Sequence, residues 1–152
     1  MKRTPDPDRF ERMIHETALL VRTRLEAFRA CGEVPIAALE EFPHGGCKTA
    51  SWIYLYYLQK YHGIDPNILY LVANAQITES ESHAWARVGR FYVDITGDQF
   101  GADKVVVCDS PLWPDIYVAP NEYPLAELRF EGFYEGYGDK FARVCRFIDR
   151  GW

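Results

Sequence analysis

The chain has 152 residues, of which 48% are hydrophobic and 15% aromatic, so it can bury a sizeable core as a single domain spanning residues 1–152. Its 17 basic and 22 acidic residues give a formal net charge of -5, without a local Lys/Arg cluster, which argues against nucleic acid as a partner. The charged start and the lack of an apolar run of about 18 residues predict neither a secretory leader nor a membrane partner.

The cysteine pattern bears on compartment and cofactors. Four unevenly spaced cysteines do not resemble a disulfide framework, and a reactive thiol is favoured in a reducing compartment, so the expected location is the cytoplasm. Delivery outside the producing cell would need a route that the sequence does not reveal. Paired Cys or His spacings typical of zinc are missing, so we expect no metal and no cofactor. The sequence leaves the oligomeric state open.

The first predicted element is a packing helix within residues 1–32. Asp6 and Pro7 provide a cap and a first-turn proline, and Gly32 provides a stop. The predicted buried stripe of this helix consists of Phe10, Met13, Ile14, Thr17, Val21, Arg24 and Phe28. Residues 33–46 are expected to form a connecting loop.

A second helix begins at Cys47, after Pro43 and two glycines, and ends at Gly63 after about four turns. Apolar or aromatic residues surround most of its circumference, which predicts a central, buried position. Cys47 in the first turn would face unpaired backbone N–H groups and the positive end of the helix dipole, and Lys48 adds a nearby cation. All three features favour a thiolate over a neutral thiol.

The remainder of the chain is predicted as strands and a closing helix. The apolar composition of residues 68–75 indicates a buried strand, and 104–108 and 115–118 suggest two more. Residues 121–138 are aromatic and glycine-rich without a clear period. Residues 139–150 have the pattern of a final helix.

A hairpin is predicted on either side of a Gly89-Arg90 turn. If these two residues form the loop, Val88 pairs with Phe91, and one face of the hairpin becomes wholly apolar. The other face carries His83, Trp85 and Arg87 together with Tyr92, Asp94 and Thr96. His83 then lies diagonal to Asp94, at roughly 7 to 8 Å between backbones, which their side chains can bridge.

Cys47, His83 and Asp94 are the residue types that an activated thiol nucleophile requires. Their order, with the cysteine at a helix N-terminus and the other two on consecutive strands, resembles the transglutaminase-like branch of the papain-like cysteine enzymes. The resemblance is narrower in three motifs, Phe-Pro-x-Gly-x-Cys, Ser-His-Ala-Trp and Val-Asp-Ile-Thr-x-Asp-Gln-Phe, which are similar to small uncharacterised bacterial and phage members. It covers about residues 42–100, the expected catalytic core.

The resemblance implies an α+β papain-like or transglutaminase-like fold, in which the central helix bearing the cysteine packs on an antiparallel sheet. It also implies amide acyl transfer or hydrolysis through a thioester on a protein or peptide substrate. In it Cys47 is the nucleophile, His83 the general base and then acid, and Asp94 the group that fixes the imidazole tautomer. Papain-like peptidases have an oxyanion-holding glutamine six residues before the cysteine, where this chain has Glu41.

Several alternatives stay open. For the second oxyanion donor the candidates are Gln99 first, then Gln76 and the Trp85 indole, beside the backbone N–H of Cys47. His44 is a rival base, and Cys31, Cys108 and Cys145 are expected to be buried structural cysteines. Among reaction outcomes, peptide or isopeptide cleavage precedes glutamine deamidation and transglutamination. The chain could also be a catalytically silent binding module, or a toxin or effector that uses the same chemistry on one host protein.

Overall fold

The computed structural model describes residues 6–31, 39, 42–43, 46–73, 76–77, 83–112, 117–118, 120–127 and 137–150. Its helices are α1 (Pro7–Ala30), α2 (Cys47–His62) and α4 (Tyr137–Arg150), with short 3-10 turns at Pro66–Ile68, Gly97–Phe100 and Leu125–Glu127. Its strands are β1 (Leu69–Ala73), β2 (Gln76–Ile77), β3 (Ala84–Val88), β4 (Phe91–Asp94), β5 (Val106–Cys108), β6 (Tyr117–Val118) and β7 (Asn121–Pro124).

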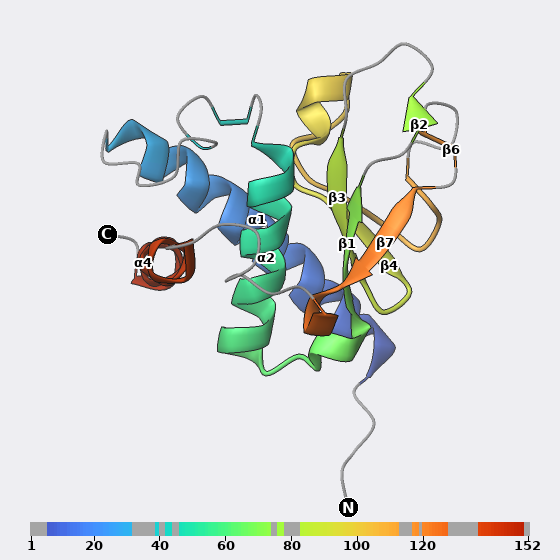
Figure 1. Ribbon diagram of the computed structural model, residues 1–152. Coiled ribbons are helices and arrows are strands. Elements are labelled where there is room, and N and C mark those ends of the chain that lie inside the picture. The colour runs from blue at the N-terminus through green and yellow to red at the C-terminus, as the bar shows by residue number, and fades with distance from the viewer. Residues whose placement is uncertain are drawn as a thin grey trace, which may run out of the picture.

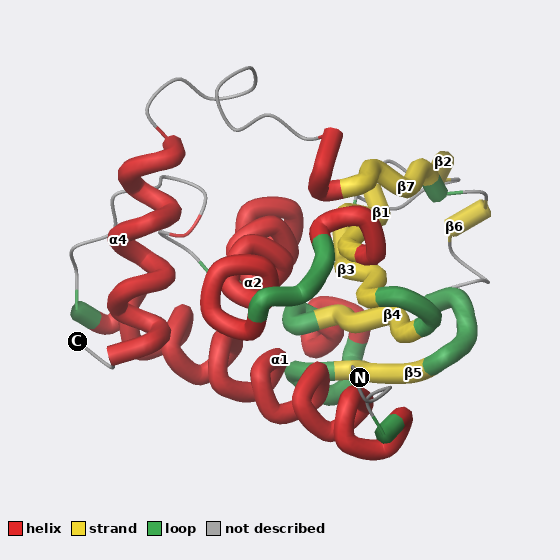
Figure 2. The backbone as a smooth tube through the Cα atoms, turned by 90° about the horizontal axis from the view of Figure 1, so that it is seen from below, coloured by secondary structure: helices red, strands yellow, loops and turns green. Residues whose placement is uncertain are grey.

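The architecture is α+β, with helices on one side of an antiparallel sheet. Five strands pair in the order β5-β4-β3-β1-β7, and β2 pairs separately with β6. Helix α2 runs between α4 and the sheet, and α1 crosses behind it (Figure 1). The view turned by 90° shows the same order, with α1 passing along α2 and on to the strands (Figure 2). The predicted helix-on-sheet arrangement is therefore confirmed at the level of the α+β class.

The predicted start of α1 and both predicted ends of α2 are confirmed, because local chemistry determines them, whereas the predicted stop at Gly32 lies outside the described residues. The side chain of Asp6 accepts a hydrogen bond from the backbone N–H of Asp8, and Pro7 occupies the first turn of α1. Helix α2 starts at Cys47 and ends at Gly63, whose φ of 63° is the left-handed conformation that glycine adopts without a steric penalty.

The hairpin has the predicted register. Val88 pairs with Phe91 and Ala86 with Val93 on either side of the Gly89-Arg90 turn. The apolar face of the hairpin, with Ala84, Ala86 and Val93 among its residues, belongs to the same core cluster as the buried side of α2. This pairing places the opposite-parity residues, His83 and Asp94 among them, together at the open end of the hairpin.

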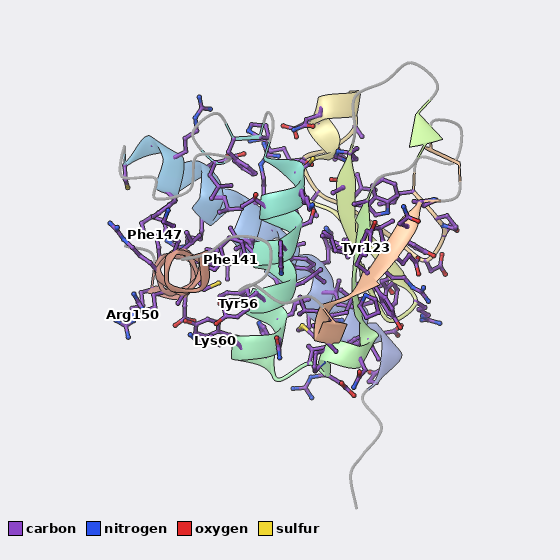
Figure 3. The ribbon with its side chains drawn as sticks, viewed as in Figure 1. Tyr56, Lys60, Tyr123, Phe141, Phe147 and Arg150 are labelled. Carbon is purple, nitrogen blue, oxygen red and sulfur yellow. The ribbon has the colours of Figure 1, made fainter. Side chains whose placement is uncertain are left out.

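Helix α2 is the centre of the core, as the apolar residues around most of its circumference predict. Ile53, Leu55 and Leu58 are fully buried, and burial stabilises side chains of this size by about 2 to 3 kcal/mol each. Phe141 of α4 lies against α2 with its ring 5.7 Å from that of Trp52, in an edge-on geometry (Figure 3). The buried Tyr54 hydroxyl donates to the carbonyl of Ile14, which joins α2 to α1.

Two local predictions were wrong or incomplete. The buried basic residue of α1 is Arg22, not Arg24, which is only half-buried. Strand β7 lies in the stretch that showed no clear period, and its terminal Pro124 is compatible with an edge strand, where no partner needs that N–H. Of the remaining predictions, most of the 33–46 loop lies outside the described residues. Among the helices that the structure does describe, none has the length and apolarity to cross a membrane.

Candidate active site

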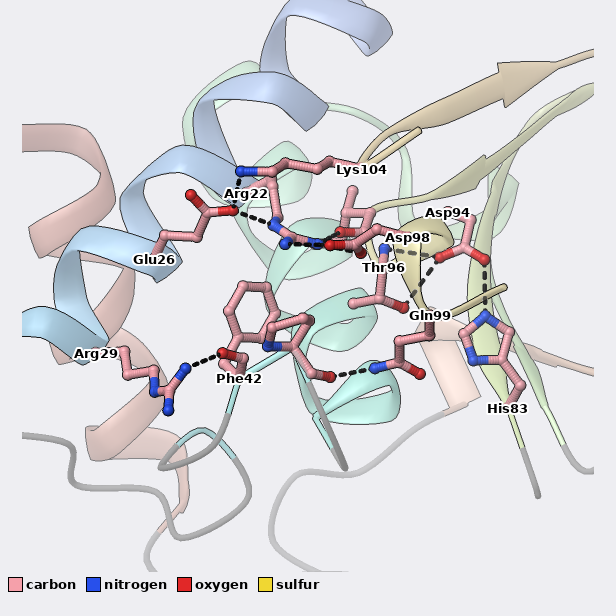
Figure 4. Close-up of polar contacts among 12 residues, drawn as sticks. Arg22, Glu26, Arg29, Phe42, His83, Asp94, Thr96, Asp98, Gln99 and Lys104 are labelled. Atoms are coloured by element: carbon pink, nitrogen blue, oxygen red, sulfur yellow. Dashed lines mark hydrogen bonds and ion pairs between the residues drawn. The ribbon is translucent and has the colours of Figure 1, made fainter. Parts of the chain in front are cut away.

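The centre of the site is a buried contact between His83 and Asp94. Nε2 of His83 lies 2.7 Å from Oδ2 of Asp94, and the two side chains are 1% and 0% exposed (Figure 4). The diagonal pair predicted from the hairpin register is therefore in direct contact. A carboxylate in this position holds the proton of the imidazole on Nε2 and favours the imidazolium when it forms.

The second oxygen of Asp94 is held by Thr96. Oδ1 accepts hydrogen bonds from the backbone N–H of Thr96 at 2.8 Å and from its hydroxyl at 3.1 Å. The backbone bond, from an aspartate to the N–H two residues on, is an Asx turn. Because both carboxylate oxygens are engaged, Asp94 has a fixed orientation. Sequence reasoning did not assign Thr96 a role, although the Asp-x-Thr-Gly spacing is typical of such a turn.

Cys47 reaches the same imidazole from the start of α2. Cys47 lies close enough to His83 to raise the pKa of the imidazole through hydrogen bonding and charge interaction. Since Asp94 occupies Nε2, Nδ1 is the ring nitrogen left for the sulfur. One helical turn further along α2, the buried Ser51 hydroxyl donates to the carbonyl of Ala84 at 3.4 Å, next to His83. Sequence spacing alone did not establish that Cys47 approaches His83. It also did not identify Ser51 as the residue that connects α2 to β3.

The electrostatics of His83 follow from these contacts. Burial alone would lower the pKa of the imidazole, but hydrogen bonds and charge interactions with Asp94 and Cys47 outweigh it and raise the pKa to about 9. At neutral pH the imidazole is therefore protonated, and its positive charge lies between Asp94 and Cys47. A thiolate beside an imidazolium is the state in which a cysteine acts as a nucleophile.

The structure separates the three candidate oxyanion donors. The Gln99 side-chain amide donates to the carbonyl of Pro43, ahead of Cys47 (Figure 4). The Trp85 ring is buried beside the imidazole, with its centroid 5.7 Å from that of His83. Gln76 lies in β2, and its side chain is outside the described residues. The backbone N–H of Cys47 is in the first turn of α2, where N–H groups have no acceptor within the helix.

The other cysteines differ in exposure, and all four are free thiols. Cys145 is buried as predicted, and burial raises its pKa to about 12. Cys31 is exposed, so its predicted burial was wrong: it follows the end of α1, beyond the last turn that packs on the core. Cys108 is half-buried on β5, and its sulfur contacts the carbonyl of Ser110. The rival base His44, and Glu41 before it, lie outside the described residues.

Two further features of the described residues bear on ligand binding. A cavity of about 300 Å³ is lined by residues of α1 and by Val107, all remote in sequence from Cys47 and His83. Within the described residues, no group of three or more His, Cys, Asp or Glu side chains is arranged to hold a metal ion.

Comparison with known proteins adds no assignment. The sequence matches no protein-family model, and neither a curated protein nor a solved structure is similar enough to count as a match. The geometry of the site and the motifs in the sequence are therefore the only indications of function.

Proposed function

We propose that this protein is a cysteine-dependent enzyme that transfers or hydrolyses an acyl group of an amide, with Cys47 as nucleophile, His83 as general base and acid, and Asp94 as the group that orients it. One observation carries this proposal. The buried imidazole of His83 is held by the Asp94 carboxylate on Nε2 and interacts with the partly exposed Cys47 at the N-terminus of α2.

The proposed reaction has two steps. The Cys47 thiolate attacks the carbonyl carbon of the amide, the C–N bond breaks, and the imidazolium of His83 gives its proton to the leaving amine, which leaves a thioester. Water or an amine then attacks the thioester carbon, the neutral imidazole takes the proton of the attacking group, and the thiolate leaves. The backbone N–H of Cys47 is positioned to stabilise the oxyanion in both steps.

The motif resemblance supports the same chemistry and points to the transglutaminase-like branch of the papain-like enzymes. A peptide bond, an isopeptide bond and a glutamine side chain all present the required amide. We rank cleavage ahead of deamidation, and deamidation ahead of transglutamination. A protein or peptide is the proposed substrate.

The alternative class is a binding module that keeps these residues for packing. The partial exposure of Cys47 argues against it, because a packing role alone favours burial, as for Cys145. A toxin or effector would use the same chemistry on one host protein. In that case expression would inhibit growth, and Cys47→Ala would abolish the inhibition.

The decisive experiment is alkylation by iodoacetamide as a function of pH, with each labelled cysteine assigned by mass spectrometry. We expect Cys47 to be labelled below about pH 7 at least ten times faster than the exposed Cys31, which serves as a reference in the same molecule. His83→Ala should abolish the difference, whereas Cys108→Ala should not change it. Equal labelling of Cys47 and Cys31 in the wild type would refute the proposal.

A second experiment identifies whether water or an amine accepts the acyl group from the thioester. Wild type and Cys47→Ala are compared on a panel of casein peptides, with peptide cleavage, ammonia release from glutamine and incorporation of a fluorescent primary amine measured in parallel. Activity that requires Cys47 in one of the three assays assigns the reaction class.

A further inference from the structure

Arg22 is a buried cation between α1 and the turn that follows Asp94. Only 4% of its side chain is exposed. Its guanidinium makes a bidentate ion pair with Asp98, with both N–O distances 2.8 Å, and also donates to the carbonyl of Ile95 at 2.9 Å (Figure 4). These bonds cross more than 70 positions of sequence, and they fix both ends of the segment that contains Thr96.

The same guanidinium contacts the segment that leads to Cys47. Its carbon lies 4.9 Å from the centre of the Phe42 ring, in a cation–π geometry. The backbone of that segment is held in addition by Arg29, which donates to the Phe42 carbonyl at 2.8 Å, and by Gln99, which donates to the Pro43 carbonyl. Arg22 therefore lies where the approach to Cys47 meets the turn after Asp94.

The path from Arg22 to the imidazole is short and continuous. Arg22 holds Ile95 and Asp98, the turn between them presents the N–H and hydroxyl of Thr96 to Asp94, and Asp94 holds Nε2 of His83. A buried ion pair contributes little net stability compared with well-packed apolar side chains. A hydrophobic residue could fill the space of Arg22, but it could not bond the Ile95 carbonyl and Asp98 together.

We propose that Arg22 is a positioning residue for the Cys47–His83 pair, and that it acts through Asp98 and the Thr96 turn to hold Asp94 against the imidazole. This inference rests on the proposed function, since the pair it positions is the proposed catalytic one. Arg22 touches neither Cys47 nor His83 in the contacts described above.

The test compares Asp98→Asn and Arg22→Met with the control Glu26→Gln. Glu26 also pairs with Arg22, at 2.7 Å, but both residues belong to α1, so this pair does not reach the site. Two quantities are measured in each folded variant: the pKa of the His83 imidazole by NMR of histidine-labelled protein, and the rate of Cys47 alkylation relative to Cys31. The NMR titration reports on the His83 environment whether or not the protein is an enzyme.

Both test variants should lower the pKa of His83 by about one unit or more and slow Cys47 alkylation at least tenfold, whereas Glu26→Gln should change the alkylation rate by less than about twofold. The two test variants remove charges of opposite sign, so a through-space effect would move the pKa of His83 in opposite directions. Such opposite shifts would overturn the proposal, as would an unchanged His83 in either variant or equal effects of Glu26→Gln.

If Arg22→Met does not fold, Asp98→Asn decides the matter, because Asp98 is partly exposed and its loss leaves Arg22 paired with Glu26. Failure of the proposed function has a different signature. In that case wild-type Cys47 is not labelled selectively, while the His83 titrations still accept or reject the positioning role of Arg22.

Discussion

The side-chain amide of Gln99 donates a hydrogen bond to the carbonyl of Pro43, so the turn after Asp94 is tied to the segment that precedes Cys47. This hydrogen bond gives Gln99 a structural role, which differs from the oxyanion binding predicted from the sequence. A hydrogen bond of this kind holds the protein in its ground state, whereas an oxyanion donor acts only where negative charge develops in a transition state.

We expect Gln99→Ala to slow Cys47 alkylation and amide turnover by the same factor, about three- to tenfold, because alkylation by iodoacetamide forms no oxyanion. The test compares the rates of Cys47 alkylation and of amide turnover in one preparation. A loss of turnover on the order of 100-fold or more with normal alkylation would instead identify Gln99 as an oxyanion donor.

Asp94→Asn should fold and yet lose turnover by a factor of about 100 to 10,000. The hydrogen bonds from Thr96 require an acceptor, so the new side chain should place its oxygen toward Thr96 and its NH₂ group toward Nε2 of His83. Nε2 then becomes the acceptor and the ring proton moves to Nδ1, where it blocks proton transfer from Cys47. Turnover and the free energy of unfolding are measured together, and full activity in a folded variant would exclude this role for Asp94.

In the proposed reaction, the pKa of His83 sets the alkaline limit of turnover. Because Asp94 and Cys47 raise that pKa to about 9, the imidazolium that protonates the leaving amine is lost above about pH 9, and turnover should fall there. Alkylation of Cys47 needs only the thiolate and should not fall. A parallel decline of both rates would contradict this assignment.

The same pKa predicts a pH-dependent contribution to stability. The folded protein holds the His83 proton more tightly than the unfolded chain, whose imidazole has a pKa near 6.5. The stabilisation is therefore fully present below about pH 6.5 and is lost as the pH rises through about 9, with a magnitude on the order of 3 kcal/mol.

Urea unfolding of wild type and His83→Ala at several pH values measures this contribution as a difference. The difference in free energy of unfolding between wild type and His83→Ala should decrease as the pH rises from about 6.5 to 9. Cys47→Ala lacks one of the two groups that raise the pKa of His83. When the effect of His83→Ala is measured in that background, the decrease should occur at lower pH. A constant difference would show that folding leaves the pKa of His83 unchanged.

The local parts of the site were predictable from the sequence. Glycine and proline signals defined the start of α2, and the period of two in the hairpin defined its register, so the contact between His83 and Asp94 followed from residue numbers. Each of these features depends on interactions between residues close in sequence. The α+β class was implied by the resemblance of the motifs to papain-like enzymes.

The contacts that assemble the site were not predictable in the same way. The bonds from Arg22 to Ile95 and Asp98, and from Ser51 to Ala84, join segments whose separation only the tertiary fold determines. One signal was present in the sequence: Arg22 occupies the same face of α1 as Ala18 and Leu25, where a charged side chain requires a buried partner. The sequence does not tell which residue that partner is.

The position of α1 limits how far this protein can be dissected. A fragment that began at residue 33 would retain Cys47, His83, Asp94 and the whole sheet, and would contain every motif on which the family resemblance depends. It would nevertheless lack the carbonyl that accepts the Tyr54 hydroxyl and the guanidinium that pairs with Asp98. The smallest part of the chain that retains these contacts is therefore larger than the motif-bearing segment, because it must include α1, which contains none of the motifs.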